Sequence, residues 1–94
     1  MRVRFTRRAN AQLDAIFNYI AKDSPVAAAA VVERIEDRAA GLSDFPYSGK
    51  PSGEEGIRVV IATPYPYLIY YHVNAKRSEV QILRIRHGAR QRRH

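Results

Sequence analysis

The chain has 94 residues, of which 46% are hydrophobic and 27% are charged. That balance is typical of one folded domain and excludes a disordered chain. The sequence has no cysteine, which excludes disulfide frameworks and thiolate metal sites and fits a reducing compartment. Because the net charge is +7, we expect an anionic partner, namely a nucleic acid, a ribosome or an acidic protein.

The sequence shows no targeting or membrane segment. The first eight residues carry four arginines and no apolar run, and no stretch reaches the ~18 consecutive apolar residues of a membrane span. The three histidines, His72, His87 and His94, lack the spacing and the carboxylate neighbours of common metal sites. We therefore expect a cytoplasmic protein with no metal and no cofactor.

The first half of the chain predicts a strand followed by two helices. Residues 2–6 alternate polar and apolar side chains, as a short strand does. Thr6 suits the N-cap of a helix that ends near residues 22–23, and Ser24 and Pro25 are favoured at the start of a second helix. With so short a connection, the two helices should form an antiparallel hairpin.

Each predicted helix carries one apolar stripe at the helical spacing of three and four residues. In the first helix the stripe consists of Ala9, Leu13, Ile16, Phe17 and Ile20. In the second helix it consists of Ala28, Val32, Ile35, Ala39 and Leu42. Both stripes have to be buried, so the helix pair should cover one face of a sheet.

The second half of the chain predicts a loop over residues 43–56, rich in Pro and Gly, and then a meander. Its three strands are expected at residues 57–62, 67–73 and 79–85. Asn74 is a plausible left-handed residue in the last hairpin connection. The order β-α-α-β-β-β predicts an α+β fold in which a helical hairpin packs on one face of a small antiparallel sheet, with residues 1–94 as a single domain.

Four motifs occur within this order of elements. They are FPYSGK at residues 45–50, GIR at 56–58, YLIYY at 67–71 and ILRIRHGAR at 82–90. With these motifs the chain resembles the RelE/ParE toxin superfamily of bacterial type II toxin–antitoxin systems over nearly its whole length. The HGAR sequence that follows the last strand is most similar to the ParE branch.

That resemblance implies a toxin that is neutralised by an acidic, co-expressed antitoxin in a hetero-oligomeric complex. ParE-type members inhibit DNA gyrase and so DNA replication, and their antitoxins are ParD-like. RelE-type members instead cut mRNA on the ribosome without a metal. We expect a ParE-like gyrase inhibitor; the alternatives are a RelE-like ribosome-dependent endonuclease and a non-enzymatic basic module that binds nucleic acid or an acidic protein.

Cationic side chains gather at the end of the last predicted strand, where a rigid element can present them to a target. The candidate target-binding residues are Arg84, Arg86, His87, Arg90, Arg92 and Arg93. The alternative is a purely structural role for two of these residues. Arg84 would then only pair with a carboxylate, either Glu79 or a loop glutamate, and the His87 ring would form its hydrogen bond with a backbone group.

The candidate antitoxin contacts are Tyr65, Tyr67 and Arg58, since tyrosine and arginine are enriched in protein interfaces. We expect apolar anchors of the antitoxin to enter a groove between the helix pair and the sheet. In the ribonuclease alternative, Arg58 and Arg84 would stabilise the phosphorane charge and His87 would be the acid. The loop offers Lys50, Glu54 and Glu55, and none of them is an evident base.

Overall fold

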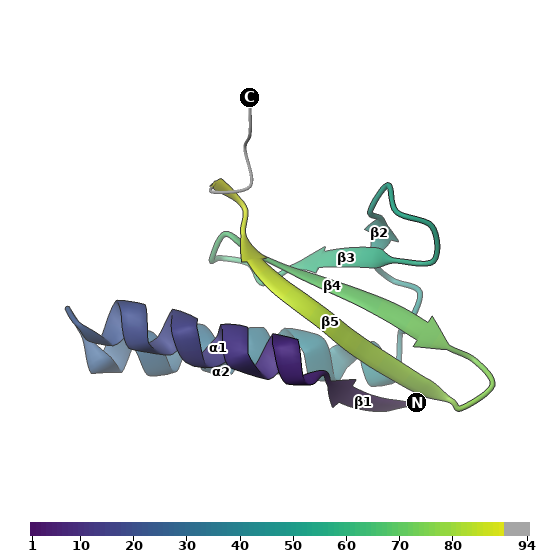
Figure 1. Ribbon diagram of the computed structural model, residues 1–94, viewed down its shortest axis with the longest axis horizontal. Coiled ribbons are helices and arrows are strands. Elements are labelled where there is room, and N and C mark those ends of the chain that lie inside the picture. Colours follow the sequence, from purple (N-terminus) through teal and green to yellow (C-terminus); the bar gives the residue numbers. More distant parts are fainter. Residues whose placement is uncertain (90–94) are drawn as a thin grey trace.

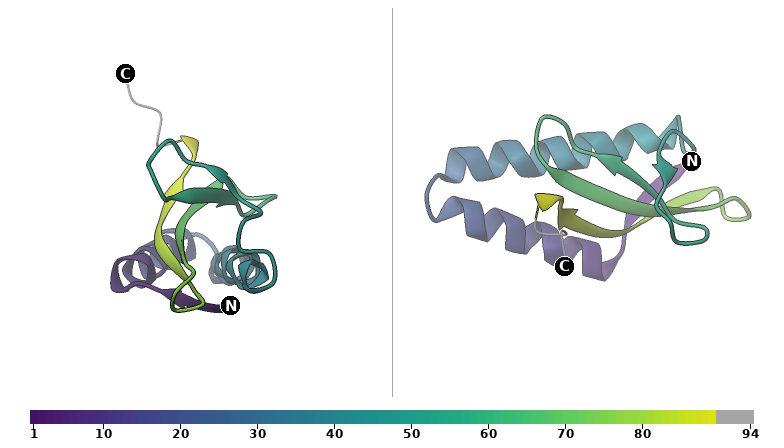
Figure 2. Two further views of the ribbon diagram at one scale, coloured as in Figure 1. Left: turned by 90° about the vertical axis from the view of Figure 1, so that its right-hand side faces the viewer. Right: turned by 90° about the horizontal axis from the view of Figure 1, so that it is seen from above.

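The computed structural model describes residues 1–89, and residues 90–94 lie outside the described part. Two helices form an antiparallel hairpin that packs on one face of a sheet, and the opposite face carries no helix (Figures 1 and 2). The predicted α+β fold is confirmed. The elements in chain order are β1 (Arg2–Phe5), α1 (Arg7–Ala21), α2 (Pro25–Ala40), the short 3₁₀ helix η1 (Gly41–Ser43), β2 (Lys50–Pro51), β3 (Arg58–Ile61), β4 (Tyr67–Asn74) and β5 (Glu79–His87).

The sheet has five strands in the order β1-β5-β4-β3-β2. Strands β3, β4 and β5 form the antiparallel meander that the sequence predicts. Two strands modify that picture. Strand β1 pairs with β5 in parallel, so the sheet is mixed, and β2 is a two-residue strand inside the predicted loop. The pairing of β1 with β5 joins the two ends of the described chain, which no local pattern in the sequence encodes.

Both helices start at the predicted caps. The Thr6 hydroxyl accepts a hydrogen bond from the Ala9 amide at 3.1 Å, and the Ser24 hydroxyl accepts one from the Ala27 amide at 3.1 Å. Pro25 occupies the first position of α2, where its missing N–H costs nothing. The helix boundaries therefore follow from local side-chain chemistry.

The helix stripes form most of one side of the core, with two corrections. Phe17 is 37% exposed, although we expected it in the buried α1 stripe. In α2 Val31 is buried, and Val32, which we expected in the stripe, is only partly buried against the core. Adjacent helical residues point about 100° apart, so spacing alone leaves the centre of a broad apolar face undetermined. The opposite side of the core is made of inward-facing strand residues, including Ile69 and Ile82.

The connection between β4 and β5 also differs from the prediction. Asn74 is the last residue of β4, opposite Glu79, and its side-chain oxygen accepts a hydrogen bond from the Arg77 amide at 3.2 Å. The left-handed residue is Ser78, with φ at +53°. Asn74 therefore shapes the turn through its side chain while its backbone stays in the ladder.

Helix α1 closes the edge of β5 beyond the point where β1 ends. The Thr6 hydroxyl donates to the Leu83 carbonyl at 3.1 Å, and the Ile85 amide donates to the Gln12 side-chain oxygen at 2.7 Å. Buried backbone groups are costly when unpaired. The polar side chains of α1 thus replace the missing strand and hold the second half of β5 in place.

Candidate functional site

The helix-free face of the sheet, which we call the open face, presents an apolar strip between cations. Residues directly opposite each other on neighbouring strands share a face, so the strand register gives two rows across it. The first row is Lys50, Val59, Tyr70 and Arg84, and the second is Ile61, Leu68 and Arg86. Ile61 is 47% exposed. Apolar side chains flanked by positive charge are suited to an amphipathic, acidic partner.

Arg84 is the most enclosed cation of this face. Its side chain is only 14% exposed, and its Nη2 donates to the Glu54 carboxylate at 2.7 Å. The guanidinium lies over the Tyr70 ring, 4.2 Å from the centroid, which adds a cation–π contact. Its Nε is buried and has no hydrogen-bond partner in the part of the chain that the structure describes. The prediction that Arg84 pairs with a loop glutamate is confirmed.

Glu79, the other carboxylate considered for Arg84, has different partners. It is buried, and it accepts hydrogen bonds from Arg2 at 2.6 Å, Arg4 at 3.2 Å and Gln81 at 3.3 Å. The hydrogen bond from Arg2 holds the pKa of Glu79 below its ordinary value of 4.5, with further help from Arg4 and against the opposing effect of burial. This cluster fastens β1 to β5 and leaves Arg84 to the loop.

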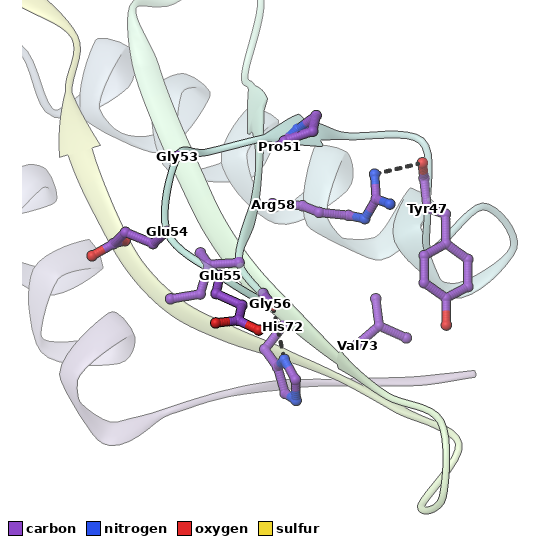
Figure 3. Close-up of a pocket in the computed structure, with 10 residues that line it drawn as sticks. Tyr47, Pro51, Gly53, Glu54, Glu55, Gly56, Arg58, His72 and Val73 are labelled. Atoms are coloured by element: carbon purple, nitrogen blue, oxygen red, sulfur yellow. Dashed lines mark hydrogen bonds between the residues drawn. The ribbon is translucent and has the colours of Figure 1, made fainter.

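A groove of about 580 Å³ lies beside the loop between β2 and β3 (Figure 3). On one side of it, Arg58 donates to the carbonyls of Gly49 at 2.8 Å and Tyr47 at 3.3 Å, and its guanidinium stacks 5.3 Å from the centre of the Tyr47 ring. On the other side, the His72 ring bonds the Gly56 carbonyl at 2.9 Å. A carbonyl only accepts, so Nδ1 carries the hydrogen in this bond.

The structure does not bring Arg58 and Arg84 together. Arg58 is paired opposite Tyr71 and Arg84 opposite Tyr70. Because successive residues of a strand point to opposite faces, the two guanidinium groups leave the sheet on different sides. Figure 3 shows Arg58 reaching toward Tyr47, away from Glu54, which holds Arg84.

His87 lies apart from both arginines, at the end of β5. Its ring meets Tyr67 edge-on at 5.1 Å between centroids, and its Nδ1 accepts a hydrogen bond from the Ala89 amide at 3.2 Å. The expectation that backbone satisfies this histidine is confirmed. Arg86, on the open face, is exposed. The other predicted target-binding arginines, Arg90, Arg92 and Arg93, lie outside the described residues.

Two of the three predicted antitoxin contacts offer little free side chain. Tyr67 is 6% exposed and belongs to the core, so its ring has almost no surface for a partner. Tyr65 is partly buried and packs against the same core. Two exposed aromatic residues, Phe45 and Tyr47, lie in the loop that precedes β2. Sequence reasoning missed them, although two aromatic residues within a loop rich in Pro and Gly were a usable signal.

A second hollow, of about 300 Å³, lies between α2 and the edge of the sheet. Arg38 of α2 lines it on one side, and Lys50, Ile61 and Leu68 are among the residues on the other. It therefore adjoins the apolar strip of the open face. Of the helix pair only α2 lines it, through Arg38, whereas the groove expected from the sequence lies between both helices and the sheet.

Residues 1–89 contain no group of three or more His, Cys, Asp or Glu residues that could hold a metal ion. Neither of the described helices has the length and apolar character needed to cross a membrane.

Comparison with known proteins identifies the family. A family model described as the ParE toxin of the type II toxin–antitoxin system parDE matches residues 3–92. The chain is 39% identical to a protein named toxin Y4kP from Sinorhizobium fredii, covering 96% of this chain and 91% of that protein. It is 38% identical to toxin RelE2 from Caulobacter vibrioides, covering 92% and 93%.

A solved structure agrees with these relatives. The chain is similar to a chain of the chromosomal ParDE system from P. aeruginosa, with a TM-score of 0.81 and 31% identity over 93% of this chain and 95% of that one. The similarity in sequence and in fold therefore extends over nearly the whole of both chains. The chain belongs to the ParE toxin family of type II toxin–antitoxin systems.

Proposed function

We propose that this protein is a ParE-type toxin that inhibits DNA gyrase and thereby DNA replication, and that a cognate antitoxin neutralises it. The observation that carries the proposal is the match of the ParE family model to residues 3–92. The similarity to a chain of a ParDE system, at 31% identity, supports the same branch of the superfamily.

The geometry gives no support to the ribonuclease alternative. Metal-free cleavage of RNA needs cations, a base and an acid that converge on one phosphate. Arg58 and Arg84 leave the sheet on opposite faces, and His87 is engaged by Tyr67 and Ala89. The proposed action is therefore tight binding to a target protein, without chemistry on a nucleic acid.

The antitoxin is proposed to bind at the hollow between α2 and the sheet. Strand β2 pairs with only two residues of β3, namely Arg58 and Val59, so Val60 and Ile61 have no described strand partner on that side. An extended segment could continue the sheet there through backbone hydrogen bonds. Ile61 offers an apolar contact, and Lys50 and Arg38 favour acidic residues in the segment.

The proposed gyrase contact is the cationic end of β5. Arg86 is its exposed described member, and Arg90, Arg92 and Arg93 extend the positive charge in the sequence. Clustered guanidinium groups speed association with an acidic surface and bind carboxylates in two-pronged geometry.

The deciding experiment is a gyrase supercoiling assay with purified protein. We expect equimolar protein to block supercoiling, and a chain that stops at Ala89 to inhibit clearly less. A matched control replaces Arg7, Arg8 and Lys76 by Gln. It also removes three positive charges, but from exposed positions elsewhere on the protein. Normal supercoiling under excess intact protein would refute gyrase as the target.

Expression in cells then separates the target classes. Gyrase inhibition should stop DNA synthesis before protein synthesis falls. An early fall in protein synthesis with cleaved mRNA would instead establish the RelE-like activity.

A further inference from the structure

The Glu54–Arg84 pair joins a loop to the open face. Glu54 lies in the connection between β2 and β3, and its carboxylate is its one described link to β5. Its side chain is 55% exposed, whereas that of Arg84 is only 14% exposed. The Glu54 carboxylate therefore reaches Arg84 from the solvent side, whereas the guanidinium is held against the sheet by its contact with the Tyr70 ring.

The loop that carries Glu54 is built on backbone turns. Gly53 and Gly56 adopt φ values of +98° and +77°, which suit glycine. The Glu54 amide bonds the Ser52 hydroxyl at 3.1 Å, and the Ile57 amide bonds the Glu54 carbonyl at 3.1 Å. These contacts keep the loop folded when the Glu54 side chain turns away. Ion pairs with one exposed partner are weak, so another carboxylate can replace this one.

The surroundings of Arg84 favour a carboxylate over a nucleic-acid phosphate. Its guanidinium is almost enclosed between Tyr70 and the loop, and a carboxylate on a flexible side chain reaches it from outside, as Glu54 does. A phosphate in a nucleic-acid backbone is bonded to two sugars, and the enclosed position of Arg84 leaves little room for them beside the guanidinium. The neighbouring side chains Val59, Leu68 and Ile61 are apolar and suit the side chains of a peptide.

We propose that Glu54 is an internal substitute for a partner carboxylate, and that an acidic, amphipathic protein segment displaces it from Arg84. The arriving carboxylate pairs with Arg84, while apolar side chains of the segment cover the strip beside it. The free protein is therefore partly self-masked, and its apparent affinity for the partner is lowered by the fraction of molecules in which Glu54 occupies the arginine. This inference deepens the proposed function, because an antitoxin segment of that chemistry would be the natural occupant.

The test measures binding of a labelled peptide of alternating leucine and glutamate to the full chain, by fluorescence anisotropy. Glu54→Gln is compared with Glu55→Gln, since both remove one negative charge from the same exposed loop and only Glu54 is paired with Arg84. We expect Glu54→Gln to tighten binding about three- to fivefold, the range that an ion pair of this kind supports. Glu55→Gln should change it less than twofold.

Two further arms identify the occupant. Adding Arg84→Met to Glu54→Gln should abolish the gain, with thermal melting showing that the double variant is folded. A single-stranded oligonucleotide should gain less from Glu54→Gln than the acidic peptide does. Equal gains for the two glutamate variants, no gain for either, or a larger gain for the oligonucleotide would each overturn the proposal. The assay contains neither gyrase nor antitoxin, so it can fail or succeed independently of the proposed function.

Discussion

Gly49 lies where the loop from the helices meets the sheet. Its amide donates a hydrogen bond to the Tyr71 hydroxyl at 2.9 Å, and Tyr71 is fully buried. A Cβ placed on Gly49 would lie 2.6 Å from that hydroxyl oxygen and 2.9 Å from the Val59 carbonyl. The position therefore requires the absence of a side chain, because backbone and a packed ring surround it.

Replacing Gly49 by Ala should destabilise the protein by about 1–3 kcal/mol, the usual cost of overpacking a core. Urea unfolding followed by circular dichroism measures the change. Gly41→Ala is the matched control, since nothing lies within 4 Å of its Cβ position and its φ is −62°. It should leave stability unchanged or raise it by up to about 1 kcal/mol. Equal losses for both variants would contradict the packing explanation.

Glu79 should make stability depend on pH in the acid range. Its folded-state pKa is lowered, chiefly by the hydrogen bond from Arg2. The contribution of this carboxylate is therefore fully present above the unfolded-state pKa, near 4.5, and is lost as pH falls through the folded-state value. The melting temperatures of the wild type and Glu79→Gln should differ at pH 7 and converge as the pH falls below 4.5 and through the folded-state pKa. Glu33→Gln, at an exposed helical position, should melt like the wild type throughout.

Helix α1 stabilises the sheet as well as the core. Thr6 both caps the helix and donates its hydroxyl hydrogen to the Leu83 carbonyl of β5, whereas Ser24 caps α2 at an exposed site with no described bond to the sheet. Two N-caps that look equivalent in the sequence therefore differ in the structure that they stabilise: Thr6 stabilises both a helix and the sheet, and Ser24 stabilises a helix.

Thr6→Ala should cost about 2 kcal/mol, of which about 1 is the cap and about 1 the hydrogen bond to β5. Ser24→Ala should cost only about 1 kcal/mol. Thr6→Ser keeps both hydrogen bonds and should stay within about 0.5 kcal/mol of the wild type. Chemical denaturation gives all three values, and a smaller loss for Thr6→Ala than for Ser24→Ala would show that the bond to β5 is unimportant.

The elements that local chemistry defines could be predicted from sequence, and those that depend on distant pairing could not. Caps and apolar periodicity located α1 and α2, and alternation with Pro and Gly boundaries located the meander. Strand β2 was missed because a strand of two residues is too short to show the alternation of polar and apolar side chains. The parallel position of β1 beside β5 was missed because its partner lies about eighty residues away along the chain.

For the molecule as a whole, the sequence located Arg58 and Arg84 on their strands but could not assign them to faces of the sheet. A shift of one residue in register moves a side chain to the other side of a sheet, and this decides that Arg58 and Arg84 diverge. The sequence offered two partners for Arg84, namely Glu79 and a loop glutamate, and could not choose between them. The choice of Glu54 depends on the three-dimensional path of the loop, whereas Glu79 pairs with Arg2. Tyr67 is buried in the core, and the sequence could not show this because a tyrosine in an alternating strand fits a core as well as an interface.

The open face should serve binding more than stability. Ile61→Thr keeps a branched side chain in β3 and should lower stability by no more than about 1 kcal/mol, since about half of the residue is exposed. It should nevertheless weaken antitoxin binding about fivefold or more, measured by titration calorimetry with the co-expressed antitoxin. Val26→Thr, at an 82% exposed position on α2, should leave that affinity unchanged. Equal affinities for all three proteins would place the antitoxin elsewhere.

The two margins of the sheet have a consequence for self-assembly. One margin is formed by β1, whose four residues include Arg2 and Arg4. Beyond β1, the side chains of Thr6 and Gln12 form hydrogen bonds with backbone groups of β5. The other margin is β2, which ends at Pro51 after two residues. Charge, brevity and proline discourage copies from stacking at these two margins, and the stretch of β3 left unpaired, Val60 and Ile61, is only two residues long. A toxin that accumulates after its neutraliser is lost would then stay dispersed instead of being deactivated by polymerisation.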